Sequence, residues 1–334
     1  MAKLKDIAAA AGVSISTVSK ALNNSSEIKK DTKARIVRIA RELNYNLSSQ
    51  QAGLPLRSDH TIGVICPEID SNYYTQLISS IGSQITRKGF NYTIAVSDFK
   101  QEKEEQALEL FGHQAVDGIV FITENSGVQS AVSSIQAIWH TPIVLIASED
   151  DVNSYDCIHI DDNLGVATGV EHLVRLGHRS IAYIGDNLTE NRLNAFRTAM
   201  TEQQVPVNEA LIHTSATRFE ACGYQGMRAI LAGNNVPTAV FAAYDDIAIG
   251  AMRAIYESGL SIPNDISIVG IDDVAVCPYL HKALTTITNP IKEMAMVSIS
   301  ILSRKIQDKD FTVVQNVVLK PMLVMRETTA KPKA

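Results

Sequence analysis

The sequence predicts two kinds of domain in one chain: an all-α helix-turn-helix head, and an α/β body made of two doubly wound lobes with parallel sheets. Three observations support this prediction. The chain has 334 residues, which exceeds the roughly 100 to 200 residues of one compact domain. Helical periodicity and basic charge coincide in the first 58 residues, and short apolar runs alternate with helical patterns in the remainder.

Three helices are predicted in the head. Apolar residues recur at helical spacing over residues 4–11, and Gly12 follows where a helix end favours a left-handed residue. Ser14 is placed to cap a second helix over about residues 15–22, and a third helix is predicted over about residues 32–43. Two short helices joined by a tight turn are typical of a helix-turn-helix, so residues 1–46 form the predicted head.

The charge is distributed unevenly. Residues 1–58 carry ten Lys and Arg against four Asp and Glu, and the remaining residues carry 20 against 32. A basic head attracts phosphates, whereas an acidic body disfavours non-specific adhesion to DNA. For charge alone, a solvated basic face without function is an equal alternative.

The second predicted helix is rich in short polar side chains, which suit a helix that enters the DNA major groove. Near its N-terminal end, Ile15 is predicted to touch a thymine methyl group and Ser16 a base edge, and Lys20 to reach a guanine or a phosphate. Phosphate contacts are predicted for the neighbouring polar side chains Ser14, Thr17, Ser19, Asn23 and Thr32. A three-helix module that binds nothing is the alternative.

The stretches "LKDIAAAAGVSISTVSKALNN" and "DTKARIVRIARELNYN" resemble the DNA-binding head of the LacI/GalR family of transcriptional regulators. The resemblance implies a homodimer that binds a roughly palindromic double-stranded DNA operator. It also implies a hinge at residues 47–59 that inserts Leu54 into the minor groove. The segment departs from the family pattern, with Leu47 where proline is usual and Pro55 after the leucine, so a flexible linker is the alternative.

Seven apolar runs in the body are bounded by turn residues and separated by helical patterns, as expected for parallel strands covered on both faces. They span residues 61–65, 92–96, 117–122, 142–147, 180–185, 238–243 and 265–271.

The body, residues 60–334, also resembles the family's periplasmic-binding-protein-type core, which binds an effector and dimerises. The order of elements predicts an N-lobe of about residues 60–160 and 291–320, and a C-lobe of about residues 161–289 and 321–334.

Ligands of doubly wound sheets bind beyond the carboxyl ends of the strands, so residues there are the predicted effector contacts. The tyrosines are suited to stacking on a sugar face and the acids to accepting hydrogen bonds from hydroxyl or amine groups, while Arg192 matches a family position that contacts effector. The predicted contacts are Tyr73, Tyr74, Glu124, Glu149, Arg192, Arg218, Phe219, Asp245 and Asp272. Each of them alone also fits a structural role. The acidic excess favours a sugar or amino sugar, and the two arginines leave an anionic effector open.

The sequence thus predicts a LacI/GalR-type transcriptional regulator, repressor or activator, whose operator affinity is modulated by a small polar ligand bound between the lobes. No phosphate-binding, nucleotide-binding or hydrolase motif is present in the sequence, and no cofactor or metal is predicted. The competing class is an α/β sugar-processing enzyme with an appended DNA-binding head. The absence of an apolar stretch long enough to span a membrane, and of a signal peptide, predicts a cytoplasmic protein without membrane contact.

Overall fold

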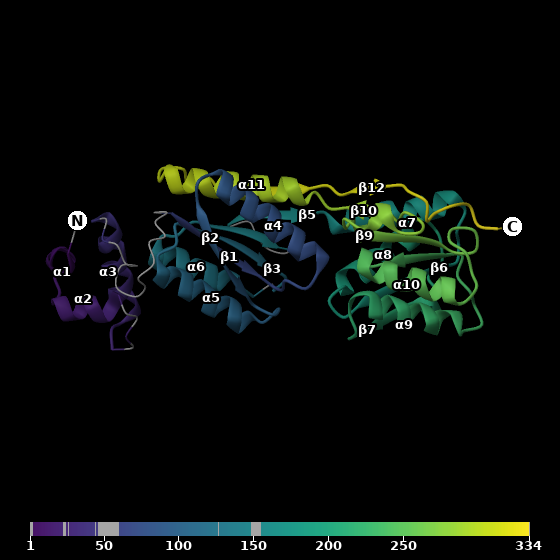
Figure 1. Ribbon diagram of the computed structural model, residues 1–334, viewed down its shortest axis with the longest axis horizontal. Coiled ribbons are helices and arrows are strands. Elements are labelled where there is room, and N and C mark those ends of the chain that lie inside the picture. The colour runs from purple at the N-terminus through teal and green to yellow at the C-terminus, as the bar shows by residue number, and fades with distance from the viewer. Residues whose placement is uncertain are drawn as a thin grey trace. The chain divides into compact units, whose positions relative to one another are not determined.

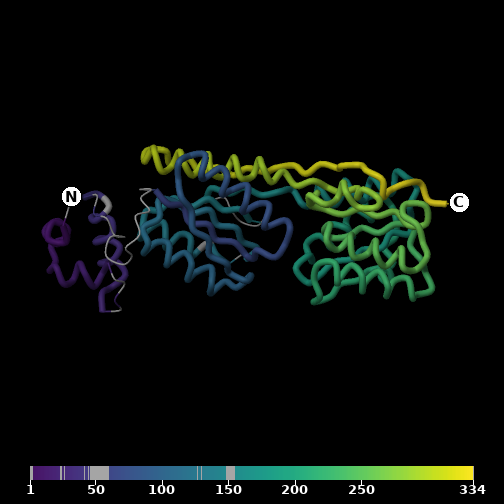
Figure 2. Tube along the Cα trace, in the orientation of Figure 1, coloured from purple at the N-terminus to yellow at the C-terminus, as the bar shows by residue number. Residues whose placement is uncertain are grey.

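A computed structural model of the chain describes residues 3–22, 25, 27–43, 45, 60–125, 127–147 and 155–333 (Figures 1 and 2). The predicted hinge, with Leu54, lies outside these residues, as do Asn23 and Glu149. Contacts between Cα atoms divide the chain into two units. Unit 1 holds Met1–Asp70, Gln76–Ile158 and Lys292–Val317, and unit 2 holds Ser71–Thr75, His159–Ile291 and Val318–Ala334. The predicted boundaries of head, hinge and lobes remain a proposal.

The head consists of α1 (Leu4–Ala11), α2 (Ile15–Leu22) and α3 (Lys30–Glu42). The predicted end of α1 at Gly12 and the predicted cap of α2 at Ser14 are confirmed. Gly12 has a left-handed backbone with φ 64° and ends α1, and the hydroxyl of Ser14 accepts a hydrogen bond from the Thr17 amide at 3.1 Å at the start of α2. The shared core is built from buried apolar residues of all three helices: Ile7, Ala8, Ala11, Val18, Ala21, Ile36 and Ala40.

The first sheet has the strand order β11-β5-β4-β3-β1-β2, and its pairs from β5 to β2 are parallel. Its strands are β1 (Thr61–Cys66), β2 (Asn91–Val96), β3 (Gly118–Thr123), β4 (Ile143–Ala147), β5 (Asp156–Ile160) and β11 (Asn316–Leu319). Its helices are α4 (Asn72–Arg87), α5 (Gln101–Gln114), α6 (Gln129–Trp139) and α11 (Ile291–Gln307). Figure 1 shows α4 and α11 on one face of the sheet and α5 and α6 on the other. Every residue of β3 is buried, as expected for a central strand covered on both faces.

The second sheet has the strand order β12-β10-β9-β8-β6-β7, in which only the edge pair of β12 with β10 is antiparallel among the pairs described. Its strands are β6 (Ile181–Asp186), β7 (Ile212–Ser215), β8 (Ala239–Ala242), β9 (Ser267–Asp272), β10 (Thr285–Thr288) and β12 (Met322–Val324). Its helices are α7 (Asp162–Leu176), α8 (Glu190–Glu202), α9 (Phe219–Leu231) and α10 (Asp245–Glu257), with short 3-10 turns at Glu209–Leu211 and Cys277–Tyr279. The predicted fold class is therefore confirmed.

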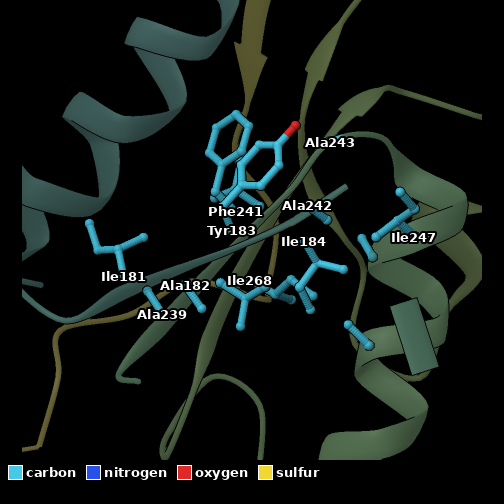
Figure 3. Close-up of a cluster of buried hydrophobic side chains, with 14 of the residues drawn as sticks. Ile181, Ala182, Tyr183, Ile184, Ala239, Phe241, Ala242, Ala243, Ile247 and Ile268 are labelled. Atoms are coloured by element: carbon cyan, nitrogen blue, oxygen red, sulfur yellow. The ribbon is translucent and has the colours of Figure 1, made fainter. Parts of the chain in front are cut away.

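An aromatic cluster fills the core of unit 2. Tyr183 of β6 and Phe241 of β8 stack with ring centroids 6.4 Å apart, and Phe196 of α8 lies 5.3 Å from Tyr183. Figure 3 shows Tyr183 and Phe241 side by side among the apolar side chains of β6 and β8. This packing fixes the central strands, whose carboxyl ends carry polar residues.

Among the described residues, no helix is long and apolar enough to cross a membrane.

Helices α9 and α10 approach so closely that only glycine fits at two positions of their contact. A Cβ atom on Gly223 would lie 1.8 Å from the carbonyl oxygen of Ile247, and one on Gly250 would lie 1.9 Å from that of Glu220. Both neighbours are backbone atoms, which cannot rotate away as a side chain can. The distance between the two helices is therefore set by these glycines.

We expect Gly223→Ala to destabilise the protein by about 2 kcal/mol or more, because the helices must separate to admit the methyl group. Helix propensity alone predicts the opposite sign, since alanine is about 1 kcal/mol better than glycine within a helix. Chemical denaturation of the full chain measures the difference, with Ala229→Ser on the exposed face of α9 as the control. An unchanged or increased free energy of unfolding would contradict this view of the contact.

Candidate DNA-binding and effector sites

The predicted DNA-contacting face of α2 is exposed. Ile15 is 52% exposed, and Ser14, Ser16 and Lys20 are also exposed, whereas Val18 on the other face is fully buried. A large apolar side chain left in solvent at a helix N-terminus gains nothing from the fold of the head itself. Its position is well suited to contact with a thymine methyl group in the major groove.

The hydroxyl groups at the start of α2 form a small network. Ser14 Oγ lies 2.8 Å from both Ser16 Oγ and Thr17 Oγ1. Lys20 pairs with Glu27, and both side chains are at least half exposed. Because exposed ion pairs contribute about 0 to 1 kcal/mol, Lys20 is able to exchange this partner for a phosphate or a base at little cost.

The remaining predicted DNA contacts are less exposed. Ser19 and Thr32 are half-buried, as is Thr17, and Asn23 and Leu54 lie outside the described residues. Arg35 was not among the predicted residues; its Nη2 donates to the carbonyl oxygen of Ala11 at 3.2 Å and ties α3 to the end of α1. No motif marks this arginine, because its partner is a backbone atom.

Arg192 is the centre of a polar cluster at the carboxyl edge of the second sheet. Its Nε and Nη2 atoms each donate to one oxygen of Asp162 at 3.2 Å, and its Nη1 donates to the carbonyl oxygen of Ala243 at 2.8 Å. Nη1 also lies 3.9 Å from Asp272 Oδ1. Burial disfavours the guanidinium charge, but Asp162 and Asp272 outweigh it and raise the pKa of Arg192. The arginine is therefore a fixed cation held by its own unit.

Asp272 ends β9 in an unusual conformation. Its φ is 112°, a left-handed value that is strained for a residue other than glycine, and such strain is concentrated at functional sites. Asn289 Nδ2 donates to Asp272 Oδ1 at 2.8 Å. Burial raises the pKa of Asp272, and nearby Arg192 opposes this shift. The buried Oδ1 of Asn289 has no hydrogen-bond partner among the described residues, so this cluster holds an unused acceptor.

A second cluster joins Arg218 and Phe219 to two residues that the sequence did not single out. The Tyr244 hydroxyl donates to Asp186 Oδ2 at 2.6 Å and accepts from the Phe219 amide at 3.0 Å. Arg218 Nε lies 3.5 Å from the same Asp186 oxygen, and its guanidinium lies 4.4 Å above the Phe219 ring. Phe219 also has a left-handed φ of 58°. These contacts hold the N-terminus of α9 against the end of β6.

Asp245 differs from the other predicted effector contacts. It is completely buried, and its two carboxylate oxygens accept hydrogen bonds from Val274, Cys277 and Thr286 of its own unit. Such a carboxylate presents no free oxygen to a ligand in this conformation. The direct contact stays a prediction from the sequence, and the geometry indicates that Asp245 instead holds the residues that follow β9.

The other predicted effector residues fall into two places. Tyr73 and Tyr74 lie in the first turn of α4 with ring centroids 5.1 Å apart, edge to face, and Tyr74 is buried. Glu124 is exposed directly after β3, and Glu149 lies outside the described residues. The structure thus groups Arg192 with Asp272, Arg218 with Phe219, and the two tyrosines with each other. Within the described part of the chain, no set of three or more His, Cys, Asp and Glu is arranged to hold a metal ion.

Four residues that complete these clusters were missed: Asp162, Asn289, Asp186 and Tyr244. Asp162 and Asn289 follow β5 and β10, which are short and partly polar and were not predicted as strands. Asp186 ends β6 as Asp272 ends β9, so the same reasoning that selected Asp272 from the sequence could have selected Asp186.

An exposed polar helix on a trihelical head, joined to two parallel-sheet units with polar strand ends, defines a DNA-binding regulator with a sensor body. Comparisons with known proteins agree. A model for bacterial regulatory proteins of the lacI family matches residues 3–48, and a periplasmic binding protein-like domain matches residues 170–329.

Two curated relatives match almost throughout. The transcriptional regulator DegA of Bacillus subtilis (strain 168) is 34% identical over 331 residues, 97% of both chains. The ribose operon repressor of Haemophilus influenzae is 31% identical over 332 residues, 98% of both chains. This chain belongs to the LacI family of DNA-binding transcriptional regulators. Its relatives regulate transcription, so it is not the enzyme of the competing prediction.

Solved structures show the same similarity. The lac repressor dimer bound to operator and an anti-inducer has a TM-score of 0.72 at 28% identity, over 98% of this chain and 99% of that one. A LacI family regulator from Enterococcus faecium with bound ribose has a TM-score of 0.71 at 27% identity, over 82% of this chain and all of that one.

Proposed function

We propose that this regulator binds a roughly palindromic DNA operator as a homodimer, and that a small hydroxyl-rich ligand, a sugar or an amino sugar, modulates its operator affinity. Its site of action is the DNA, so we place it in the cytoplasm. Linkage limits the modulation to the difference in ligand affinity between the operator-binding and non-binding conformations, typically about 1 to 3 kcal/mol.

The exposed N-terminal face of α2 supports the DNA-binding part of the proposal. Ser14 both caps the helix and holds Ser16 and Thr17, so the side chains that would meet bases are ordered before DNA arrives. A preorganised contact loses less side-chain entropy on binding. The basic head supplies the long-range attraction to phosphates.

The cluster around Arg192 is the observation that carries the ligand class. Both oxygens of Asp162 and one backbone carbonyl already occupy three N–H groups of this arginine, so it is not a free cation awaiting an anion. Asp272 and the unpartnered Asn289 Oδ1 instead supply acceptors. Acceptors in a buried setting select donors, which are the hydroxyl groups of a sugar or the ammonium group of an amino sugar.

Exposed apolar side chains support self-association. In unit 2, Tyr279 is 85% exposed and nearby Val276 is 42% exposed, and in unit 1 the alternate residues Tyr92, Ile94 and Val96 of β2 are exposed. Apolar surface of this kind marks an interaction site when it is contiguous. The lac repressor relative described above is a dimer, so we assign these surfaces to a second copy of the chain.

The DNA contact is tested by Ser16→Ala and Lys20→Ala in the full chain, after selection of a preferred site from random duplexes. We expect Ser16→Ala to lower discrimination at one operator position by about 1 kcal/mol, roughly fivefold. We expect Lys20→Ala to lose a similar or larger amount, and Lys5→Ala, an exposed lysine on α1, to keep the position-specific preference. Fluorescence anisotropy against single-base operator variants measures this, and unaltered preferences in both α2 variants would refute the assignment.

The ligand site is tested by thermal-shift screening with sugars, amino sugars and purines, followed by calorimetry of Asp272→Asn. The amide keeps the shape of the carboxylate but loses its charge and one acceptor, so we expect the affinity for the identified ligand to fall at least tenfold. Asp310→Asn, at an exposed position, serves as the control. Equal ligand affinity in wild type and Asp272→Asn would remove Asp272 from the site.

The dimer surface is tested by Tyr279→Asp, which places a charge where we expect an apolar contact. Sedimentation equilibrium of the full chain should show at least a tenfold weaker dimer, while Val236→Asp, at another apolar position that is 53% exposed, leaves it unchanged. A wild-type dimer constant in Tyr279→Asp would show that the second copy binds elsewhere.

A further inference from the structure

The segment 273–279, which follows β9, connects a predicted effector contact to the proposed dimer surface. It begins directly after Asp272 and ends at Tyr279. Within it, Val274 and Cys277 are buried, whereas Val276 and Tyr279 are exposed. One side of the segment therefore faces the interior of unit 2, and the other carries the apolar side chains offered to a partner.

Asp245 holds the interior side of this segment. Its Oδ2 accepts a hydrogen bond from the Val274 amide at 3.0 Å and lies 3.2 Å from Cys277 Sγ. Its Oδ1 accepts from the Thr286 hydroxyl at 2.6 Å, which anchors the carboxylate to β10. A single side chain at the start of α10 thus ties the segment to the sheet at two points.

The fold is adapted to this carboxylate. A Cβ atom at position 270 of β9 would lie 2.2 Å from Asp245 Oδ1, so glycine is required beneath it. Burial and the adjacent Asp245 raise the pKa of the Cys277 thiol, which therefore keeps its proton and acts as a donor. Both groups of the segment that meet Oδ2, the Val274 amide and the Cys277 thiol, are then donors, and an acceptor at position 245 satisfies them together.

Arg326 holds the segment at a further point, its first residue, Asp273. Arg326 Nη2 donates to Asp273 Oδ1 at 2.6 Å, and its Nη1 donates to the carbonyl oxygen of Leu284 at 2.8 Å. Asp273 has a left-handed φ of 55°, as Asp272 has one of 112°. Two successive residues in this region make the path of the segment costly to adopt without such anchors.

We propose that Asp245 is a positioning residue that fixes segment 273–279 in the conformation that presents Val276 and Tyr279 to a second copy of the chain. This inference rests on the proposed homodimer. It gives Asp245 an indirect role in place of the direct ligand contact predicted from the sequence. The proposed ligand contact Asp272 and the proposed dimer surface then lie on one continuous stretch, the end of β9 and segment 273–279, which Asp245 holds in place.

The pH dependence of dimerisation gives a signature that a purely structural role lacks. Burial raises the pKa of Asp245 to about 7, the hydrogen bonds from Thr286, Val274 and Cys277 oppose this shift, and Asp273 adds to it. Release of the segment would remove the hydrogen bonds from Val274 and Cys277, which hold the pKa of the buried carboxyl down, so the released state has the higher pKa and protonation favours release. The other charged or titratable groups here are Asp272, Asp273, Cys277 and Arg326.

Sedimentation equilibrium of the full chain between pH 6 and pH 8 tests the proposal, with Asp245→Asn and Thr286→Val compared with wild type. Asparagine lacks the negative charge that strengthens the hydrogen bonds from Val274 and Cys277, so we expect a dimer at least tenfold weaker. Thr286→Val removes the hydrogen bond to the other oxygen but leaves the Val274 and Cys277 contacts, so we expect a change below threefold. The wild-type dimer should weaken as the pH falls through 7, and Asp245→Asn should not show this dependence.

A wild-type dimer constant in Asp245→Asn, or equal weakening in both variants, would overturn the proposal. If Asp245→Asn fails to fold by circular dichroism, Cys277→Ala and Cys277→Ser replace it. The serine variant retains a donor and should restore the dimer that alanine weakens, and equal behaviour of the two would again overturn the proposal. Tyr279→Asp separates the levels of failure: if it stays dimeric, the proposed surface and this inference both fall, and if it is monomeric while Asp245→Asn is not weakened, only this inference falls.

Discussion

The pairing of the largely buried Arg192 with buried Asp272 and half-exposed Asp162 is the constraint on which the sensor part of the molecule depends. A guanidinium taken out of water costs several kcal/mol unless carboxylates surround it, and hydrophobic residues of similar size often serve stability as well or better. Stability alone therefore gives little reason for this cluster, which supports the ligand-binding role that we propose for it. The cluster requires the ends of β8 and β9 and the start of α7 to meet, which the parallel order of the second sheet provides.

The head and the sensor differ in how their polar side chains are exposed to solvent. In the head, side chains that would be costly to bury are left in solvent on α2, where an anionic duplex is able to satisfy them. In the sensor, the polar groups around Arg192 are largely paired with one another, and Asn289 Oδ1 is left as an acceptor without a partner among the described residues. An exposed set of donors suits phosphates and base edges, and a buried set of acceptors suits hydroxyl groups. If the proposed function is right, the two sites select different ligands because one set of polar groups is exposed and the other is buried.

The sequence predicted most of the fold because the central strands and the head helices are encoded locally. The run "DGIVFI" is apolar enough to be a strand covered on both faces, and Gly12 and Ser14 mark the turn between α1 and α2. The strands "IHTS" and "TTIT" were missed because half or more of their residues are polar and their stability comes from neighbouring strands. The internal role of Asp245 was out of reach for the same reason: its partners are 29 to 41 residues away along the chain.

One chain joins a DNA-binding head to a sensor body, and we propose that the sensor alters the head's affinity for its operator. The most direct measurement is the dissociation constant of the intact protein for its selected operator and for a scrambled duplex, each at fixed salt with and without saturating ligand from the thermal screen. We expect a preference of at least about a hundredfold for the operator, and a change of about 5 to 150-fold in operator affinity when ligand is added. Equal affinity for both duplexes, or an operator affinity that saturating ligand leaves unchanged, would contradict this proposal.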